Sequence, residues 1–181
     1  DAIDTLENLD GFGIAHGGAD ANLPAAREAS LLDAGGVTVG ILGYDTIMPA
    51  YAATADSPGT NEMSAARVRA DIAAAREAGA QLVIVFPHWG TEYSAGTTAT
   101  QRSLAHAAID AGADLVIGSH THWAGGIEVY KSVPIFYSLG DFVFNISRSE
   151  QTQEGPLLEL TFSGTRLLQV RIHPFLILDG S

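Results

Sequence analysis

Hydrophobic and polar residues alternate along the first two thirds of the chain in segments that predict strands and helices in turn. Strongly apolar runs are typical of parallel strands buried on both faces. They lie at residues 37–43, 82–86 and 114–117. Between them, residues 64–78 and 99–111 have the composition and spacing of helices, and Gly79 and Gly112 stand where such helices end. This order predicts an α/β fold with a parallel sheet.

Weaker patterns predict the remaining elements. Residues 2–9 predict a helix with Ile3, Leu6 and Leu9 on one face. Before residue 62 we expect a strand at 13–15, a helical turn at 25–29, a pairing strand at 30–32 and a loop at 44–61. After residue 122 the helices stop, and the expected strands are 127–130, 135–138, 157–162 and 167–173. Strands without helices between them predict antiparallel additions, on a second sheet.

Composition narrows the class of protein. The chain has 181 residues, a length that fits one domain spanning residues 1–181, and 46% of them are apolar, as in globular proteins. A formal net charge of −12 argues against a nucleic-acid-binding surface and against docking on anionic lipid. No apolar stretch approaches the roughly 20 residues of a membrane span. The absence of cysteine excludes disulfides and thiolate ligands.

The start of the chain adds an expectation about its extent. A helix at residues 2–9 opens the alternation of strands and helices, although a strand normally precedes such a helix. We therefore expect this chain to be the C-terminal part of a longer protein.

Histidines follow two of the predicted parallel strands. His88 comes just after strand 82–86, whereas His120 and His122 follow strand 114–117. Open α/β sheets place their chemistry beyond the carboxyl ends of such strands, and imidazole is a common ligand of zinc and related metals. The pair could bind one ion, or one ion each of two that lie about 3.5–4 Å apart. The alternatives are a satisfied core histidine at His88 and surface-loop histidines at the other two positions.

Polar residues near these histidines are candidates for supporting roles. Glu92 could be a ligand, a partner that orients an imidazole, or a general acid/base, and its alternative is a solvated loop carboxylate. Tyr93 could donate to a substrate oxygen or simply pack. Asp141 and Asn145 offer oxygens at another junction of strand and loop, which by itself reads as a structural turn.

Three blocks of sequence together resemble one family. They are Pro87-His88-Trp89-Gly90-Thr91-Glu92-Tyr93, then residues 112–122 ending in Gly118-Ser119-His120-Thr121-His122, then residues 134–142 ending in Leu139-Gly140-Asp141-Phe142. In this order they resemble the bacterial capsule synthesis CapA family, the poly-γ-glutamate biosynthesis proteins with a calcineurin-like metallophosphoesterase fold. Family members commonly have proline where Thr121 stands and asparagine where Asp141 stands.

The resemblance implies a fold, a metal and a set of roles. The implied fold is an α/β metallophosphoesterase-like sandwich of two mixed β-sheets flanked by helices, here without its N-terminal elements. His88 would match the lone-histidine motif, and His120 and His122 the terminal histidine pair, as ligands of divalent Mn, Fe or Zn. Aspartate and Asn-His motifs of the family are absent from this chain, so a dinuclear centre is expected only in the longer protein.

The function implied is a metal-dependent, phosphoesterase-like hydrolase of capsule or poly-γ-glutamate synthesis. Under this hypothesis His88 and Glu92 serve catalysis, and Tyr93, Asp141 and Asn145 bind substrate at the rim. The substrate would be an anionic polymer or a phosphoester, with capsule-synthesis membrane proteins as partners and a location outside the cell or in its envelope. The alternative is a non-hydrolytic component that binds the polymer or a partner during assembly.

Overall fold

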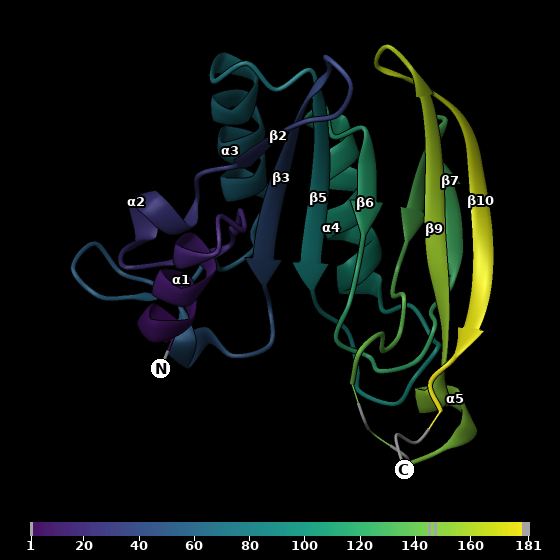
Figure 1. Ribbon diagram of the computed structural model, residues 1–181. Coiled ribbons are helices and arrows are strands. Elements are labelled where there is room, and N and C mark those ends of the chain that lie inside the picture. The colour runs from purple at the N-terminus through teal and green to yellow at the C-terminus, as the bar shows by residue number, and fades with distance from the viewer. Residues whose placement is uncertain (1, 145, 147, 179–181) are drawn as a thin grey trace.

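The centre of the fold is a mixed sheet in which four neighbouring strands run parallel. The computed structural model describes residues 2–144, 146 and 148–178, and within them this sheet has six strands. Antiparallel strands close both edges. In spatial order the strands are β2 (Ser30–Asp33), β3 (Thr38–Asp45), β5 (Leu82–His88), β6 (Leu115–Ile117), β8 (Val133–Phe136) and β7 (Ile127–Tyr130). Figure 1 shows β3, β5 and β6 side by side with their carboxyl ends at one edge.

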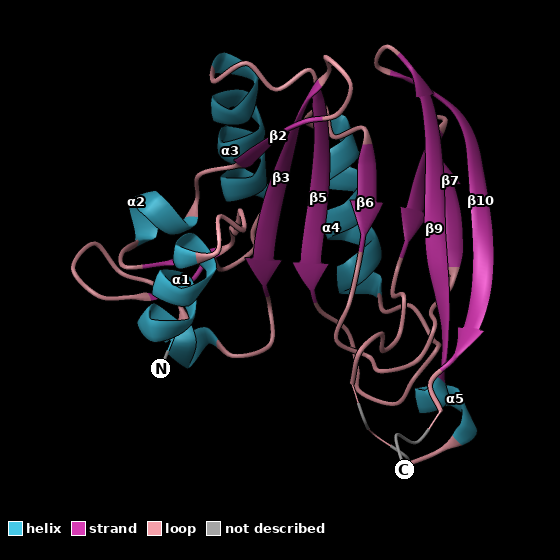
Figure 2. Cartoon of the chain, viewed as in Figure 1, coloured by secondary structure: helices cyan, strands magenta, loops and turns pink. Residues whose placement is uncertain are grey.

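Two helices cover one face of this sheet. They are α3 (Ala65–Glu77) and α4 (Ala99–Asp110), which Figure 2 shows lying along the same side of the strands. Val83 and Val85 of β5 point into the core that these helices close. Each helix begins with a side-chain cap, since Ser64 accepts from the Arg67 amide and Thr98 forms a capping box with Gln101.

A β-hairpin lies against the opposite face of the sheet. Its strands are β9 (Glu154–Ser163) and β10 (Arg166–Leu176), which pair antiparallel. Leu158, Leu160 and Val170 of the hairpin pack on the second core cluster, which includes Leu115 and Ile117 of β6. Because side chains alternate along a strand, β6 contributes Val116 to one core and its two neighbours to the other.

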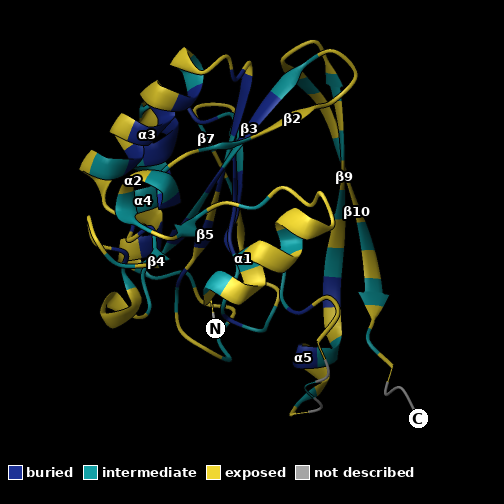
Figure 3. Cartoon of the chain, turned by 60° about the vertical axis from the view of Figure 1, so that its left-hand side comes forward, coloured by how far each residue is buried: buried dark blue, intermediate teal, exposed yellow. Residues whose placement is uncertain are grey.

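Short elements fill the N-terminal third and the approach to the hairpin. The helix α1 (Ala2–Gly11) buries none of its side chains, and Figure 3 shows it largely exposed. The others are β1 (Ala19–Asp20), α2 (Leu23–Ala26), the 3₁₀ turn η1 (Pro49–Tyr51), β4 (Gly59–Thr60) and α5 (Glu150–Gln153). Of the described residues, none belongs to a helix with both the length and the apolar character of a membrane span.

The main predicted elements are confirmed, and several of the weaker ones are wrong. The expected strand at 13–15 is irregular chain, and strand β1 forms later. The helical turn lies at Leu23–Ala26, earlier than expected, because Asn22 accepts from the Ala25 amide and caps it. The expected loop at 44–61 contains the end of β3, η1 and β4. Strand β5 continues to His88, two residues further than predicted. The strands expected on a second sheet divide, since β7 and β8 join the six-stranded sheet, with β8 parallel to β6, and β9 and β10 form the separate hairpin.

A buried carboxylate joins the N-terminal third to helix α3. Asp71 is 2% exposed and accepts from the Arg27 guanidinium at 2.7 Å. The Tyr44 hydroxyl and the Asn61 amide also donate to it, at 3.0 and 3.2 Å. Burial, reinforced by the charge of Asp71, raises the pKa of Tyr44 far above its ordinary value, so this hydroxyl remains a donor. The buried charge is therefore compensated by three partners.

We predict that Asp71→Ala destabilises the fold by about 3 kcal/mol, because it leaves the partially buried Arg27 and two buried polar groups without their acceptor. Urea titration of the free energy of unfolding measures the loss. Glu77→Ala, at an exposed acid on the same helix, is the matched control and should change stability little. Equal effects of the two substitutions would contradict this assignment.

Candidate functional site

Parallel pairing brings the ends of three strands together. In the register of β3 and β5, Asp45 lies opposite His88, the last residue of β5. An isolated bridge then joins His88 to Ser119, the residue before His120. The strand-end residues of β3, β5 and β6 are therefore neighbours at one edge of the sheet, where the loops gather in Figure 2.

One buried indole joins the ends of β5 and β8, and the end of β6 lies between them. Trp89, which is 1% exposed, follows β5 and donates its Nε1–H to the carbonyl of Tyr137 at 2.9 Å. Gly118, which follows β6, lies between them, so that a Cβ at this position would collide with the Tyr137 carbonyl and the Trp89 indole. Glycine is thus required at position 118 by close approach of its neighbours.

The backbone around the histidines is strained. Among the described residues, five other than glycine have positive φ, and three of them are Tyr93 at 57°, His120 at 94° and His122 at 60°. The other two, Lys131 and Ser132, form the tight turn between β7 and β8, where such angles are usual. Side chains held in this conformation cost energy and cluster at functional sites.

His88 and His120 are in direct contact. The His120 Nδ1 and His88 Nε2 atoms lie 2.9 Å apart, and the ring centroids 4.6 Å apart. One ring must donate and the other accept, so the two nitrogens share one proton. The Ser119 hydroxyl lies 3.2 Å from the other nitrogen of His88. His88 is exposed, which contradicts the alternative interpretation of a satisfied core histidine.

Both of these imidazoles favour the neutral form. His88 is exposed, but neighbouring atoms remove part of the water around its ring, and this partial desolvation, together with the neighbouring His120, lowers the pKa of His88 below its ordinary value of 6.5. Burial also lowers the pKa of His120, with Glu92 and Asp45 acting in the opposite direction. Neutral rings keep a nitrogen lone pair available at neutral pH, which is the form that binds metals.

His122 stands beside this pair with a carboxylate behind it. Its Nδ1 lies 2.9 Å from Asp141 Oδ1, and its ring centroid lies 6.4 Å from that of His120. A histidine that donates Nδ1–H to a carboxylate keeps Nε2 free as an acceptor or ligand. Asp141 is 8% exposed, and its second oxygen is buried with no hydrogen-bond partner among the described atoms. Asp141, which we predicted to bind substrate at the rim, is therefore in contact with His122 and orients its ring.

The remaining predicted residues lie at differing distances from this cluster. The Tyr93 ring stacks on His122 with a centroid separation of 5.3 Å, so Tyr93 forms one wall of the site. Glu92 is exposed and makes no hydrogen bond or ion pair within the described part of the chain, although its charge reaches both His88 and His120. Asn145 lies outside the described residues. The roles assigned to these side chains remain predictions.

Asp45 is a site residue that the sequence analysis missed. It lies opposite His88 in the sheet, and its charge acts on the pKa values of His88 and His120. Its Oδ1 accepts from the Ile47 amide at 2.8 Å. The sequence does contain a clue to Asp45, because it closely follows an apolar run. We ended the predicted strand at residue 43, so Asp45 was not counted as a strand-end residue.

The side chains at the strand ends are of the chemical types that bind metals. Imidazole nitrogens suit Mn, Fe and Zn, and the His122–Asp141 pair resembles the supported ligands of metal sites. Among residues 2–144, 146 and 148–178, no group of three or more histidine, aspartate and glutamate side chains is arranged to hold an ion. By themselves, the described residues form no complete ligand set.

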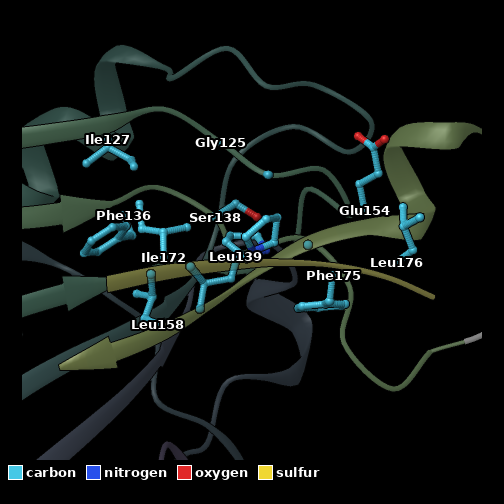
Figure 4. Close-up of a pocket in the computed structure, with 14 residues that line it drawn as sticks. Gly125, Ile127, Phe136, Ser138, Leu139, Glu154, Leu158, Ile172, Phe175 and Leu176 are labelled. Atoms are coloured by element: carbon cyan, nitrogen blue, oxygen red, sulfur yellow. The ribbon is translucent and has the colours of Figure 1, made fainter. Parts of the chain in front are cut away.

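A large cavity lies elsewhere, between the β7–β8 edge of the sheet and the hairpin. It has a volume of about 810 Å³ and mainly apolar walls, including Phe136, Leu158 and Ile172 (Figure 4). No histidine lines it. Its lining includes one titratable side chain, Glu154, whereas several titratable and metal-binding groups gather at the strand ends, so we place the candidate site there.

Comparison with known sequences identifies relatives. Residues 2–146 match the family described as bacterial capsule synthesis protein PGA_cap. The capsule biosynthesis protein CapA of Bacillus anthracis is 34% identical over 184 residues, covering 98% of this chain and 44% of that protein. The PGA biosynthesis protein CapA of Bacillus subtilis is 38% identical over 140 residues, covering 77% and 36%. The chain spans less than half the length of these relatives.

Comparison with solved structures identifies the fold. A 5′-nucleotidase precursor from Thermus thermophilus aligns with a TM-score of 0.53 at 15% identity, covering 94% of this chain and 35% of that chain. The fold is metallophosphoesterase-like, which confirms the predicted fold class. At this level of identity the likeness concerns the fold alone.

We predict that Gly118→Ala destabilises the protein by about 2 kcal/mol, because the added methyl group displaces the Trp89 indole or the Tyr137 carbonyl. Urea titration measures the change. Gly126→Ala is the control, since its added carbon meets only the Thr97 hydroxyl at ordinary contact distance, 3.4 Å. A Gly118→Ala protein as stable as the control would disprove the proposed constraint.

We predict that, with a chelator present, stability decreases as the pH falls below about 6.5. In this range the unfolded chain protonates His88 and His120 before the native protein does, because their native pKa values are lowered. The loss is complete once the pH is below the native values. His120→Gln should flatten this dependence, because it removes one of the two histidines with a lowered pKa. Chemical denaturation across pH tests this.

Proposed function

Because the chain belongs to the bacterial capsule synthesis family that residues 2–146 match, we propose that its strand-end histidines form part of a metal-dependent, phosphoesterase-like hydrolase centre. The observation that supports this most directly is the contact between His88 and His120, with His122 beside them and held by Asp141. Neutral imidazoles brought together from two strand ends are suited to metal binding.

His88, His120 and His122 would hold the metal, with oxygen ligands from elsewhere in the full protein. Divalent Mn, Fe or Zn, one ion or two, supplies Lewis acidity and a bound water of lowered pKa. If both His88 Nε2 and His120 Nδ1 bound metal, the hydrogen between them would move to the other nitrogen of its ring, so that each of these two atoms offers a lone pair. The lowered pKa values of the two rings would keep both in the neutral form that binds metals at neutral pH.

Two acidic residues have distinct tasks in this proposal. Asp141 accepts from His122 Nδ1, which fixes the tautomer and leaves Nε2 as the ligand atom. Glu92 is exposed close to the pair and can take up or deliver a proton, with His88 as the alternative acid/base. Tyr93 stacks on His122 and would contact substrate. The substrate-binding role expected for Asn145, which lies outside the described residues, stays a prediction.

The biological task that we propose follows from the relatives. Proteins of capsule and PGA biosynthesis are similar to this chain over most of its length. We propose that the whole protein acts on an anionic polymer or a phosphoester in capsule or poly-γ-glutamate synthesis. Its partners would be capsule-synthesis membrane proteins, and its place would be the cell envelope or the exterior.

We predict that the double variant His88→Ala/His122→Ala binds Mn²⁺ or Zn²⁺ at least about tenfold more weakly than the wild type. The reason is the loss of two of three imidazole ligands. Equilibrium dialysis followed by plasma mass spectrometry measures metal per chain. His173→Ala is the control, because this partly buried histidine lies on the hairpin and is paired with Glu159.

Full metal loading of the double variant would contradict the proposed ligands. Turnover of a generic phosphodiester by the full-length protein, lost in the double variant, would support the hydrolase. Metal binding that depends on these histidines, without any turnover, would instead favour the non-hydrolytic role, in which the domain binds polymer or a partner.

A further inference from the structure

One cation beside the histidines lacks an acidic partner. The chain has nine lysines and arginines against 21 acidic residues. Within the described residues, six of the nine form ion pairs: Arg27, Arg67, Arg76, Arg102, Lys131 and Arg171. Among the residues that the structure describes, Arg148 has no acidic partner, although acidic residues outnumber basic ones more than twofold in the chain. An unpaired arginine in so acidic a chain has donors available for another group.

An aromatic ring holds this arginine in place. The guanidinium carbon of Arg148 lies 4.0 Å from the centroid of the Tyr93 ring. The Tyr93 ring in turn stacks on His122, whose ring lies 5.9 Å from that of Phe144 and nearly parallel to it. These four side chains form a column that ends in the guanidinium. Stacking leaves the N–H groups at the edge of a guanidinium free for hydrogen bonds.

The column connects the cation to the candidate site. Tyr93 adopts its left-handed backbone conformation, with φ of 57°, and its amide donates to the Thr121 carbonyl at 2.8 Å. This bond ties the loop that contains Tyr93 to the residue between His120 and His122. Arg148 is thus attached, through one ring, to the segment that contains two of the proposed ligands.

Without a bound metal, the charges around the histidines make a nearby cation necessary if an anion is to bind. His88 and His120 favour the neutral form, and Asp45, Glu92 and Asp141 add negative charge around them. An anionic group approaching these residues meets repulsion from a chain of net charge −12. Arg148 is a fixed positive charge at this edge, because arginine stays protonated at any physiological pH.

We propose that Arg148, oriented by Tyr93, is an oxyanion-binding residue that receives a carboxylate or phosphoryl group of the substrate at the rim of the histidine site. The planar fork of a guanidinium matches two oxygens of either group. This inference rests on the proposed function only in taking the histidine edge as the place where substrate binds. It requires no metal and no turnover.

Isothermal titration of the chelated protein at low ionic strength tests this proposal. The two probes are inorganic phosphate and γ-linked triglutamate, which separate phosphoryl from carboxylate recognition. We expect Arg148→Gln to weaken binding of the preferred probe about tenfold or more, since a charge-assisted, two-pronged contact is lost. Arg148→Lys should restore binding only in part, because an ammonium has no fork.

Further variants separate a specific site from general charge. Arg166→Gln removes another unpaired, exposed arginine, at the start of β10, and should leave binding unchanged. Tyr93→Leu should weaken binding several-fold while Tyr93→Phe, which keeps the ring, should not. Thermal unfolding of each variant verifies that the fold is intact.

Three outcomes would overturn the inference. They are no binding of either probe to the wild type at ~10 mM, unchanged binding in Arg148→Gln, and an equal loss in Arg166→Gln. The metal and turnover experiments are separate. If probe binding depends on Arg148 but metal binding does not depend on the histidines, the proposed hydrolase is refuted and the oxyanion site is retained.

Discussion

The hydrogen bond from the Trp89 indole to the Tyr137 carbonyl is the constraint on which the candidate site depends. It joins the ends of β5 and β8, and β6 passes between them at Gly118. His88 precedes this indole in the chain, and His120 follows this glycine by two residues. If the strand ends could slide, the 2.9 Å contact between the two imidazoles would be lost. Core packing and site geometry are therefore set by the same buried contact.

Two kinds of side-chain environment meet at this edge. Toward the helices, the strands end in a dry core with a fully buried indole. Toward the loops, the imidazoles, the Asp141 carboxylate and the stacked Tyr93 are partly open to water. Rigid support on one side and access on the other are the conditions for a binding or catalytic centre. Tyr93, His120 and His122 have positive φ angles, a conformation that costs energy and persists where the surrounding contacts hold it.

The regular part of the fold could be predicted from sequence because its signals are local. Strongly apolar strands and capped, glycine-terminated helices fixed β3, β5, β6, α3 and α4 to within two residues. The strand expected at 13–15 failed because Gly13 takes a positive φ and the few apolar residues there find no partner strand. The three histidines were found because each follows an apolar run. Asp45 and Arg148 were missed because their proximity to the site depends on strand register and on stacking across 55 positions of sequence.

The positive φ angles at Tyr93, His120 and His122 limit how this sequence can drift. A position in that conformation excludes β-branched residues, so valine, isoleucine and threonine are blocked by the backbone alone, whatever the side chain does. Neutral evolution at these three positions would pass through glycine, asparagine or aspartate, which tolerate the conformation. Proteins descended from this sequence that keep the fold but lose the activity should therefore have glycine, asparagine or aspartate at these three positions.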